Sequence, residues 1–220
     1  MIYGINPSSL IDYPGEMSFV IFLGGCNFNC PFCHNKDIVN KATTTISEEE
    51  VINMLKERTK LISTVTITGG EPTIYNEQLI DLIKKIKNIN YKIKLDTNGS
   101  NPAIIKKLID LKLIDFIAMD IKNTFEKYEE TIQTKININD IKKSIDYIQN
   151  SSIPYEFRTT INKEMHSSLD IEKIMSYIKD ITKYKVQPYR FTKQQLTDTK
   201  FTEWTTDELK EIESKKKVTT

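Results

Sequence analysis

The sequence predicts an α/β fold with parallel strands, arranged as an open, partial (β/α)6 barrel. Short runs rich in β-branched residues alternate with segments of helical periodicity, and this alternation occurs six times along the chain. Repeated alternation of this kind implies a parallel sheet with right-handed crossovers. Polar residues and glycines also follow the predicted strands, at the end where such barrels bind their ligands. Six units are too few for a closed eight-stranded barrel, so we expect an open one.

Length and charge limit the classes of protein to which the chain can belong. The 220 residues, 39% of them hydrophobic, suffice for one core, so we expect a single domain over 1–220. Its core would cover about 15–192, between a short N-terminal lead-in and a C-terminal helix. A formal charge of +1 provides no field that attracts nucleic acid or an anionic membrane. The apolar runs are too short to span a bilayer and no secretory pattern is present, which predicts a cytoplasmic location.

Six runs of β-branched and aromatic residues have the composition of strands, and turn-forming residues bound most of them. We expect strands at 18–23, 64–68, 92–95, 115–119, 155–161 and 184–187.

Helices are expected between these strands, because the intervening segments carry apolar residues at helical spacing. Ser47 and Glu50 form a capping box ahead of the first segment. The Asn101-Pro102 pair favours a helix start, since proline suits the first helical position. Three further helices are expected after Asn76, after Asp140, and from Asp170 to Ile181.

Three cysteines, the only ones in the chain, follow the first predicted strand as Cys26, Cys30 and Cys33. An odd number of closely spaced cysteines without a secretory signal argues for metal or redox chemistry rather than disulfides. The Cys-x3-Cys-x2-Cys spacing can hold three irons of a 4Fe-4S cluster and leave the fourth iron open. That open iron is where a small molecule could be activated.

The other predicted strands also end in residues suited to ligand binding. Because the carboxyl ends of parallel strands meet at one rim, we expect these residues to gather there. They are Gly69, Gly70 and Glu71, then Asp96, Thr97 and Asn98, then Asp120 and Lys122, and finally Arg158 and Arg190.

With the cysteine loop at 25–35 and the motifs at 69–72, 96–99 and 120–122, the chain resembles the radical S-adenosylmethionine (SAM) superfamily. Within it, the chain is similar to activases of glycyl-radical enzymes, such as the activating proteins of anaerobic ribonucleoside-triphosphate reductase and of pyruvate formate-lyase. The resemblance covers most of the chain, with the motifs in the expected order. It implies a radical SAM core and an oxidoreductase that uses a 4Fe-4S cluster and SAM.

The resemblance also implies roles for individual residues. Cys26, Cys30 and Cys33 would ligate the cluster, and the amino and carboxylate groups of SAM would chelate its fourth iron. Asp96, Thr97 and Met119 match a monovalent-cation site beside SAM. The positions that would bind SAM are Phe32, Asn35, Gly69, Gly70, Glu71, Asp96, Asn98, Asp120, Lys122, Arg158 and Arg190.

The function that the resemblance implies is the transfer of a radical to a protein. Cleavage of SAM would give a 5'-deoxyadenosyl radical, which would abstract a hydrogen atom from a glycine of an anaerobic ribonucleotide reductase or a formate-lyase type enzyme. Flavodoxin or ferredoxin would donate the electron. No further cysteines are present, so one cluster is the limit.

Three other hypotheses are open. A radical SAM enzyme acting on a small molecule, like 7-carboxy-7-deazaguanine synthase, would share the cysteine spacing. Cys30 and Cys33 alone could form a thioredoxin-like redox pair, which the third cysteine and the glycine turn argue against. A non-catalytic Cys3His zinc module could use His34, but adjacent Cys33 and His34 side chains face one tetrahedral ion with difficulty.

Overall fold

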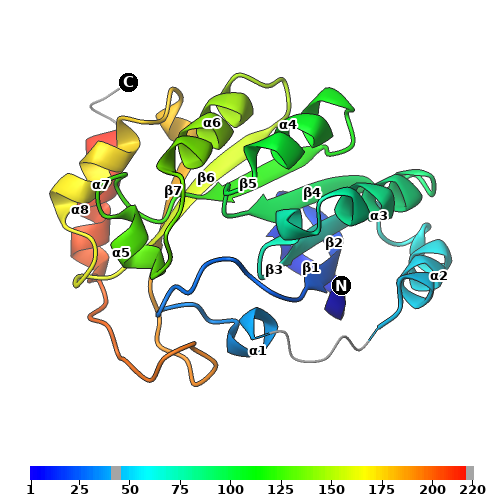
Figure 1. Cartoon of the computed structure of the whole chain (residues 1–220), viewed down its shortest axis with the longest axis horizontal. Helices are drawn as coiled ribbons and strands as arrows, with labels where there is room; N and C mark the ends of the chain where they lie inside the picture. Colours follow the sequence, from blue (N-terminus) through cyan, green and yellow to red (C-terminus); the bar gives the residue numbers. More distant parts are fainter. Residues whose placement is uncertain (41–45, 217–220) are drawn as a thin grey trace.

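The computed structural model describes residues 1–40 and 46–216, which form one curved seven-stranded sheet with helices along its outer side (Figure 1). The strand order in the sheet follows the order in the chain. Six strands are parallel, and only the N-terminal strand is antiparallel to its neighbour. This is the expected partial (β/α)6 barrel, with one additional strand at its edge.

All six predicted strands are present, and each boundary lies within two residues of the expected one. The register of the second and third strands aligns Leu23 with Gly69, so that their ends meet at one rim. The parallel strands are β2 (Glu16–Leu23), β3 (Thr64–Gly69), β4 (Lys92–Thr97), β5 (Phe116–Asp120), β6 (Tyr155–Ile161) and β7 (Tyr184–Pro188).

The expected N-terminal lead-in is instead a long edge strand, β1 (Ile2–Tyr13), which forms a hairpin with β2. Pro7 and the two serines after it interrupt the alternation that would have predicted this strand. Proline is tolerated there because an edge strand leaves some N–H groups unpaired. The pairing with β2 also shifts register between Asn6 and Ser9, which lets the irregular segment stay in the sheet.

Two helices begin at their predicted caps. Ser47 and Glu50 form the capping box of α2, and the Asn101 side chain accepts a hydrogen bond from Ile104 N–H at the start of α4. The long helices are α2 (Glu48–Arg58), α3 (Glu77–Lys87), α4 (Pro102–Asp110), α6 (Ile138–Gln149), α7 (Ser168–Met175) and α8 (Thr206–Lys216). The short ones are α1 (Lys36–Val39), α5 (Tyr128–Ile132) and the 3-10 turns η1 (Pro72–Tyr75) and η2 (Ile181–Lys183).

Two helices differ from their predictions. α6 begins at Ile138, capped by Asn137, instead of after Asp140. α7 begins after Ser167, which forms a capping box with Asp170, and ends at Met175 instead of continuing to Ile181. Asp180 accepts a hydrogen bond from Thr182 N–H and so starts a separate turn, which breaks the helical periodicity. None of the helices in the described ranges is both long enough and apolar enough to cross a membrane.

The two faces of the sheet differ in polarity. Side chains facing the helices, such as Ile67, Leu95 and Phe157, are fully buried and apolar. The alternate positions on the inner face include Thr66 and Lys94, which are also buried but polar. Because buried polar groups are costly unless paired, the interior of the barrel must satisfy its own hydrogen bonds and charges.

The fully buried carboxylate of Glu71 joins the segment after β3 to the end of β4. Its Oε1 accepts hydrogen bonds from Thr73 N–H and the Thr73 hydroxyl at 3.0 and 2.5 Å, and from the Thr97 hydroxyl at 2.7 Å. Its Oε2 accepts one from Asn98 N–H at 2.6 Å. Burial raises the pKa of this carboxyl group, although all four donors favour its charged form. The two strand ends are thereby held in a fixed relation.

Replacement of Glu71 by Gln should destabilise the protein, because the amide group cannot accept hydrogen bonds at both of its ends. Leaving one buried donor unpaired costs about 1–3 kcal/mol. We expect a loss of this size in the free energy of unfolding of the cluster-free protein, measured with urea. Glu77→Gln is the matched control, since Glu77 pairs with the exposed surface residue Lys107 and should matter far less. Equal losses in the two variants would contradict the role of Glu71.

Candidate active site

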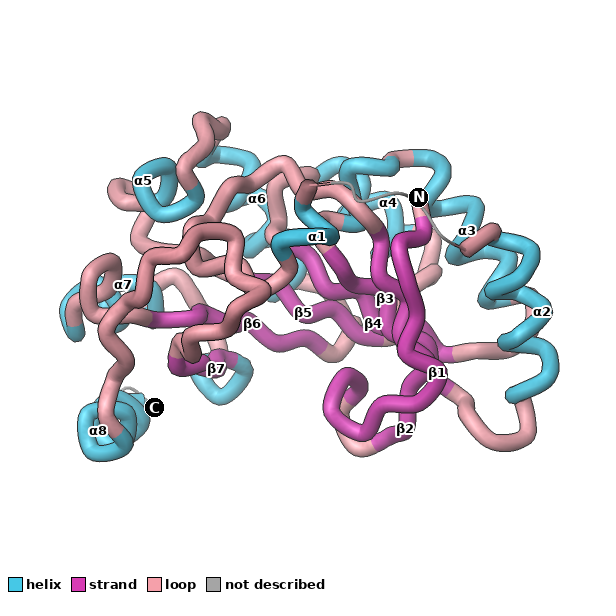
Figure 2. The backbone as a smooth tube through the Cα atoms, turned by 90° about the horizontal axis from the view of Figure 1, so that it is seen from below, coloured by secondary structure: helices cyan, strands magenta, loops and turns pink. Residues whose placement is uncertain are grey.

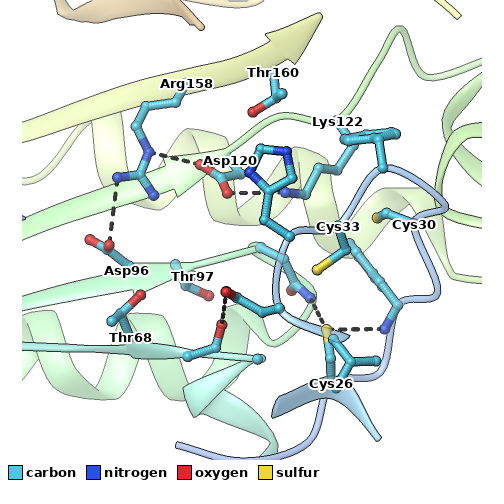
Figure 3. A pocket seen from close by; sticks show the side chains of 18 of the residues that line it. Cys26, Cys30, Cys33, Thr68, Asp96, Thr97, Asp120, Lys122, Arg158 and Thr160 are labelled. Carbon is cyan, nitrogen blue, oxygen red and sulfur yellow. Dashed lines mark hydrogen bonds and ion pairs between the residues drawn. The ribbon is translucent and has the colours of Figure 1, made fainter. Parts of the chain in front are cut away.

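A cavity of about 490 Å³ opens at the carboxyl ends of the strands. The cysteine loop after β2 lines one side of it, and the ends of β3 to β7 line the other (Figure 3). The predicted site residues that line it are Cys26, Cys30, Phe32, Cys33, Asn35, Gly69, Gly70, Asp96, Thr97, Asn98, Asp120, Lys122 and Arg158. The convergence expected at this rim is therefore found.

The three cysteines border the same cavity and none of them is in a disulfide. Cys30 is buried, whereas Cys26 and Cys33 are half-buried. Phe28 N–H donates to Cys26 Sγ at 3.4 Å, and Asn98 Nδ2 lies 4.0 Å from the same sulfur. Burial raises the pKa of Cys26 to about 11 and that of Cys30 to about 12. These two thiols are therefore protonated at neutral pH unless a bound cation stabilises the thiolates.

The donor set fits an iron-sulfur cluster better than a single ion. Within 1–40 and 46–216, no three His, Cys, Asp or Glu side chains lie close enough together to hold one metal ion. Three separate sulfurs around one cavity suit a cluster that spans the space between them. Cys26, Cys30 and Cys33 would hold such a cluster, and the cavity leaves room beside it for a ligand.

Gly69 and Gly70 lie against the start of the cysteine loop. Gly69 has a φ of +127°, and a Cβ there would lie 2.2 Å from the carbonyl oxygen of Leu23. A Cβ on Gly70 would lie 2.0 Å from the carbonyl oxygen of Gly25. Only glycine permits this approach, which exposes backbone rather than side chains to the cavity. The Asn35 side chain donates to the Gly69 carbonyl at 3.3 Å and links the turn to the far end of the loop.

A row of alternating charges crosses the opposite wall of the cavity (Figure 3). Arg158 Nη1 lies 3.5 Å from Asp96 Oδ2, and Arg158 Nε donates to Asp120 Oδ1 at 2.8 Å. Lys122 Nζ lies 3.0 Å from Asp120 Oδ2. Burial opposes ionisation of Asp120, but the charges of Arg158 and Lys122 hold its pKa well below the usual range. Asp120, Lys122 and Arg158 therefore stay ionised at neutral pH and present fixed charges to a ligand.

The loop between β7 and α8, residues 189–205, supports the cysteine loop from outside the sheet (Figure 2). Leu196 N–H donates to the Cys33 carbonyl at 2.8 Å, and Lys36 N–H donates to the Gln194 carbonyl at 3.1 Å. Gln195 is buried and fixes the loop itself, because its side chain accepts from the Tyr189 hydroxyl and donates to two backbone carbonyls. The cysteine loop is therefore held by a segment far away in the sequence.

Three predicted site residues do not line the cavity. Glu71 has the structural contacts described above. Met119 is buried on the outer face of β5 beside Gly99. Arg190 is exposed and forms an ion pair with Glu203. Of those that do line it, Phe32 is nearly buried and packs edge-on against Phe201, with ring centroids 6.3 Å apart.

Several residues that line the cavity were given no site role in the sequence prediction. Thr68, Thr160 and Gln187 share the inner face of their strands with the charged row, so alternation within each strand could have identified them. Asp12 comes from β1, which was not predicted as a strand. The remaining missed residues are Phe28, His34 and Val39.

Comparison with known proteins identifies the family of this chain. The model of the Radical SAM superfamily matches residues 20–173. A putative glycyl-radical enzyme activating enzyme of Methanocaldococcus jannaschii is 35% identical over 193 residues, covering 86% of this chain and 80% of that protein. The pyruvate formate-lyase-activating enzyme of Clostridium pasteurianum is 26% identical over 201 residues, covering 86% and 81%. The 7-carboxy-7-deazaguanine synthase of Clostridium acetobutylicum is 24% identical over 184 residues, covering 76% and 80%.

Among solved structures, SuiB of Streptococcus suis bound to the precursor peptide SuiA has a TM-score of 0.70 at 16% identity. The match covers 89% of this chain but only 44% of SuiB. At that identity the likeness supports the fold alone. The family is shown by the superfamily match over most of the chain and by the 35% identical relative. This chain therefore belongs to the radical SAM superfamily of enzymes.

Proposed function

We propose that this enzyme installs a glycyl radical on a partner protein, using SAM as the source of the radical. When bound, the 4Fe-4S cluster would supply the electron that cleaves SAM into methionine and a 5'-deoxyadenosyl radical. The observation that carries the proposal is the 35% identity, over 86% of the chain, to a relative named as a putative glycyl-radical enzyme activating enzyme. The partner would be an anaerobic ribonucleotide reductase or formate-lyase type enzyme, and flavodoxin or ferredoxin would donate the electron.

The residues of the cavity have complementary roles in this proposal. Cys26, Cys30 and Cys33 hold the cluster at one wall. The backbone at Gly69 and Gly70, which line the cavity, would accept hydrogen bonds from the ammonium group of SAM. On the opposite wall, the row of charged side chains from Asp96 to Lys122 would orient the carboxylate and the ribose of SAM. Since the ion pairs and burial already fix these groups, little reorganisation is needed when SAM binds.

Anaerobic reconstitution with iron and sulfide should load about four irons per chain. The reduced enzyme should then convert SAM into 5'-deoxyadenosine. Replacing Cys26, Cys30 or Cys33 by Ser should remove most of the iron and the SAM cleavage, because each thiolate holds one corner of the cluster. Iron and sulfide analysis together with chromatography of the nucleoside products measures both effects.

His34→Ala is the matched control for the cysteine variants, since His34 also lines the cavity and adjoins Cys33. It should retain its iron, because the fourth iron is reserved for SAM rather than for imidazole. A wild-type protein that takes up zinc alone, or a His34→Ala variant that loses as much metal as Cys33→Ser, would support the Cys3His site and contradict the proposal.

Incubating the reconstituted enzyme with SAM, a reductant and a candidate glycyl-radical protein should produce a protein radical. We expect an electron paramagnetic resonance signal that disappears when the target glycine is changed to Ala or when the enzyme carries Cys26→Ser. The distant synthase relative supplies the competing hypothesis. Formation of 7-carboxy-7-deazaguanine, with no protein radical on any candidate, would favour that hypothesis and overturn this one.

A further inference from the structure

Lys94 is a buried lysine on the inner face of β4, and its side chain is only 3% exposed. Residues two apart in a strand point to the same face, so Lys94 lies next to Asp96, which lines the cavity. Lys94 Nζ lies 2.5 Å from Asp96 Oδ1. Lysine is rarely buried this deeply unless it is paired with an acidic residue. The ion pair with Asp96 therefore accounts for the burial of Lys94 inside the barrel.

Both oxygens of the Asp96 carboxylate already face a cation. Oδ1 faces Lys94, and Oδ2 lies 3.5 Å from Arg158 Nη1. Arg158 in turn lies 2.8 Å from Asp120 and 3.8 Å from Glu156, so its charge is also balanced within the network. A further cation at Asp96 would have to displace one of these two, or approach a carboxylate whose charge is already compensated.

The side chains of the other two residues in the predicted monovalent-cation site are also engaged elsewhere. The Thr97 hydroxyl donates to Glu71, on the opposite face of the sheet from Asp96. Met119 is fully buried against Gly99 on that same outer face. Of the three residues, only Asp96 directs its side chain toward the cavity, so the side chains do not converge on one position. Thr97 and Met119 have only their backbone carbonyl groups to offer a cation beside Asp96.

We propose that the ammonium group of Lys94 supplies, as a fixed part of the chain, the positive charge that a bound monovalent cation would otherwise supply at Asp96. Lys94 thus acts as a positioning residue, which holds Asp96 in its orientation toward the ligand in the cavity. The inference rests on the proposed SAM site but not on the identity of the partner protein. Binding of SAM is then independent of K⁺ and Na⁺.

Removal of the Lys94 charge should make the binding of SAM depend on K⁺, a dependence that the wild type lacks. Lys94→Met leaves Asp96 Oδ1 without a cation, and because Asp96 lines the cavity an ion from solvent can reach it. Lys92→Met is the matched control. Lys92 precedes Lys94 by two residues on the same strand, but it is about half exposed and pairs with Glu16. The double variant Lys94→Met with Asp96→Asn removes both charges and should abolish any response to K⁺.

The experiment compares the dissociation constant of SAM for the reconstituted enzyme in chloride salts of K⁺, Na⁺ and tetramethylammonium at equal ionic strength. Melting temperatures of the cluster-free proteins in the same salts give a second readout. Wild type and Lys92→Met should bind SAM equally, within about twofold, in all three salts. Lys94→Met should bind SAM at least about tenfold more weakly in tetramethylammonium than in K⁺. Its melting temperature should rise with K⁺, while that of the wild type should not.

A wild-type SAM affinity that rises tenfold with K⁺ or Na⁺ would overturn the inference, as would a Lys94→Met variant that responds equally to all three salts. Should Lys94→Met fail to fold, the SAM affinity of the wild type in the three salts still tests the inference. A wild-type affinity that depends on K⁺ would contradict the proposal that Lys94 supplies the cation. A wild type that binds SAM in none of the salts would refute the proposed function instead. In that case the melting temperatures of the cluster-free proteins still test Lys94.

Discussion

The carboxylate of Glu71 fixes the rim of the barrel, because it accepts four hydrogen bonds that join the segment after β3 to the end of β4. Gly70, immediately before it, contacts the start of the cysteine loop, and Asn98, which donates to it, approaches Cys26. One buried side chain thus sets the distance between the loop that would hold the cluster and the strands that would hold SAM. An acidic residue at the rim can thus fix the positions of the ligand-binding segments without contacting the ligand itself.

The inner face of the sheet explains why the site can hold a charged ligand. Most barrel interiors are filled with bulky apolar side chains, whereas here Lys94, Asp96, Arg158 and Asp120 form a continuous set of ion pairs. Each buried charge would be costly alone, and the costs are offset only because every member has a partner. The same pairing orders the side chains before any ligand arrives, so the wall of the cavity is rigid as well as polar.

The parts of the structure that depend on local patterns were predictable from sequence. The six parallel strands follow from β-branched runs, the starts of α2 and α4 follow from Ser47 and Asn101, and the cavity-lining motifs follow from their place after each strand. β1 was missed because Pro7 and its neighbouring serines hide its alternation, and its pairing comes from β2. The ion pair of Lys94 with Asp96 was equally unpredictable, because strand alternation indicates the face on which a residue lies but not its ion-pair partner.

The β7–α8 loop shows why the cysteine motif identifies the site without building it. The cysteine loop is largely irregular, so its backbone groups need partners outside a helix or sheet. Several of these come from more than 150 residues away: Leu196 N–H bonds to the Cys33 carbonyl, and the Thr197 hydroxyl to the Pro31 carbonyl. Such contacts have no periodicity and no short-range signal, so no local pattern in the sequence predicts them. The spacing of the three cysteines therefore indicates which ligand they can hold. The contacts of the cysteine loop with the β7–α8 loop determine where that ligand would lie.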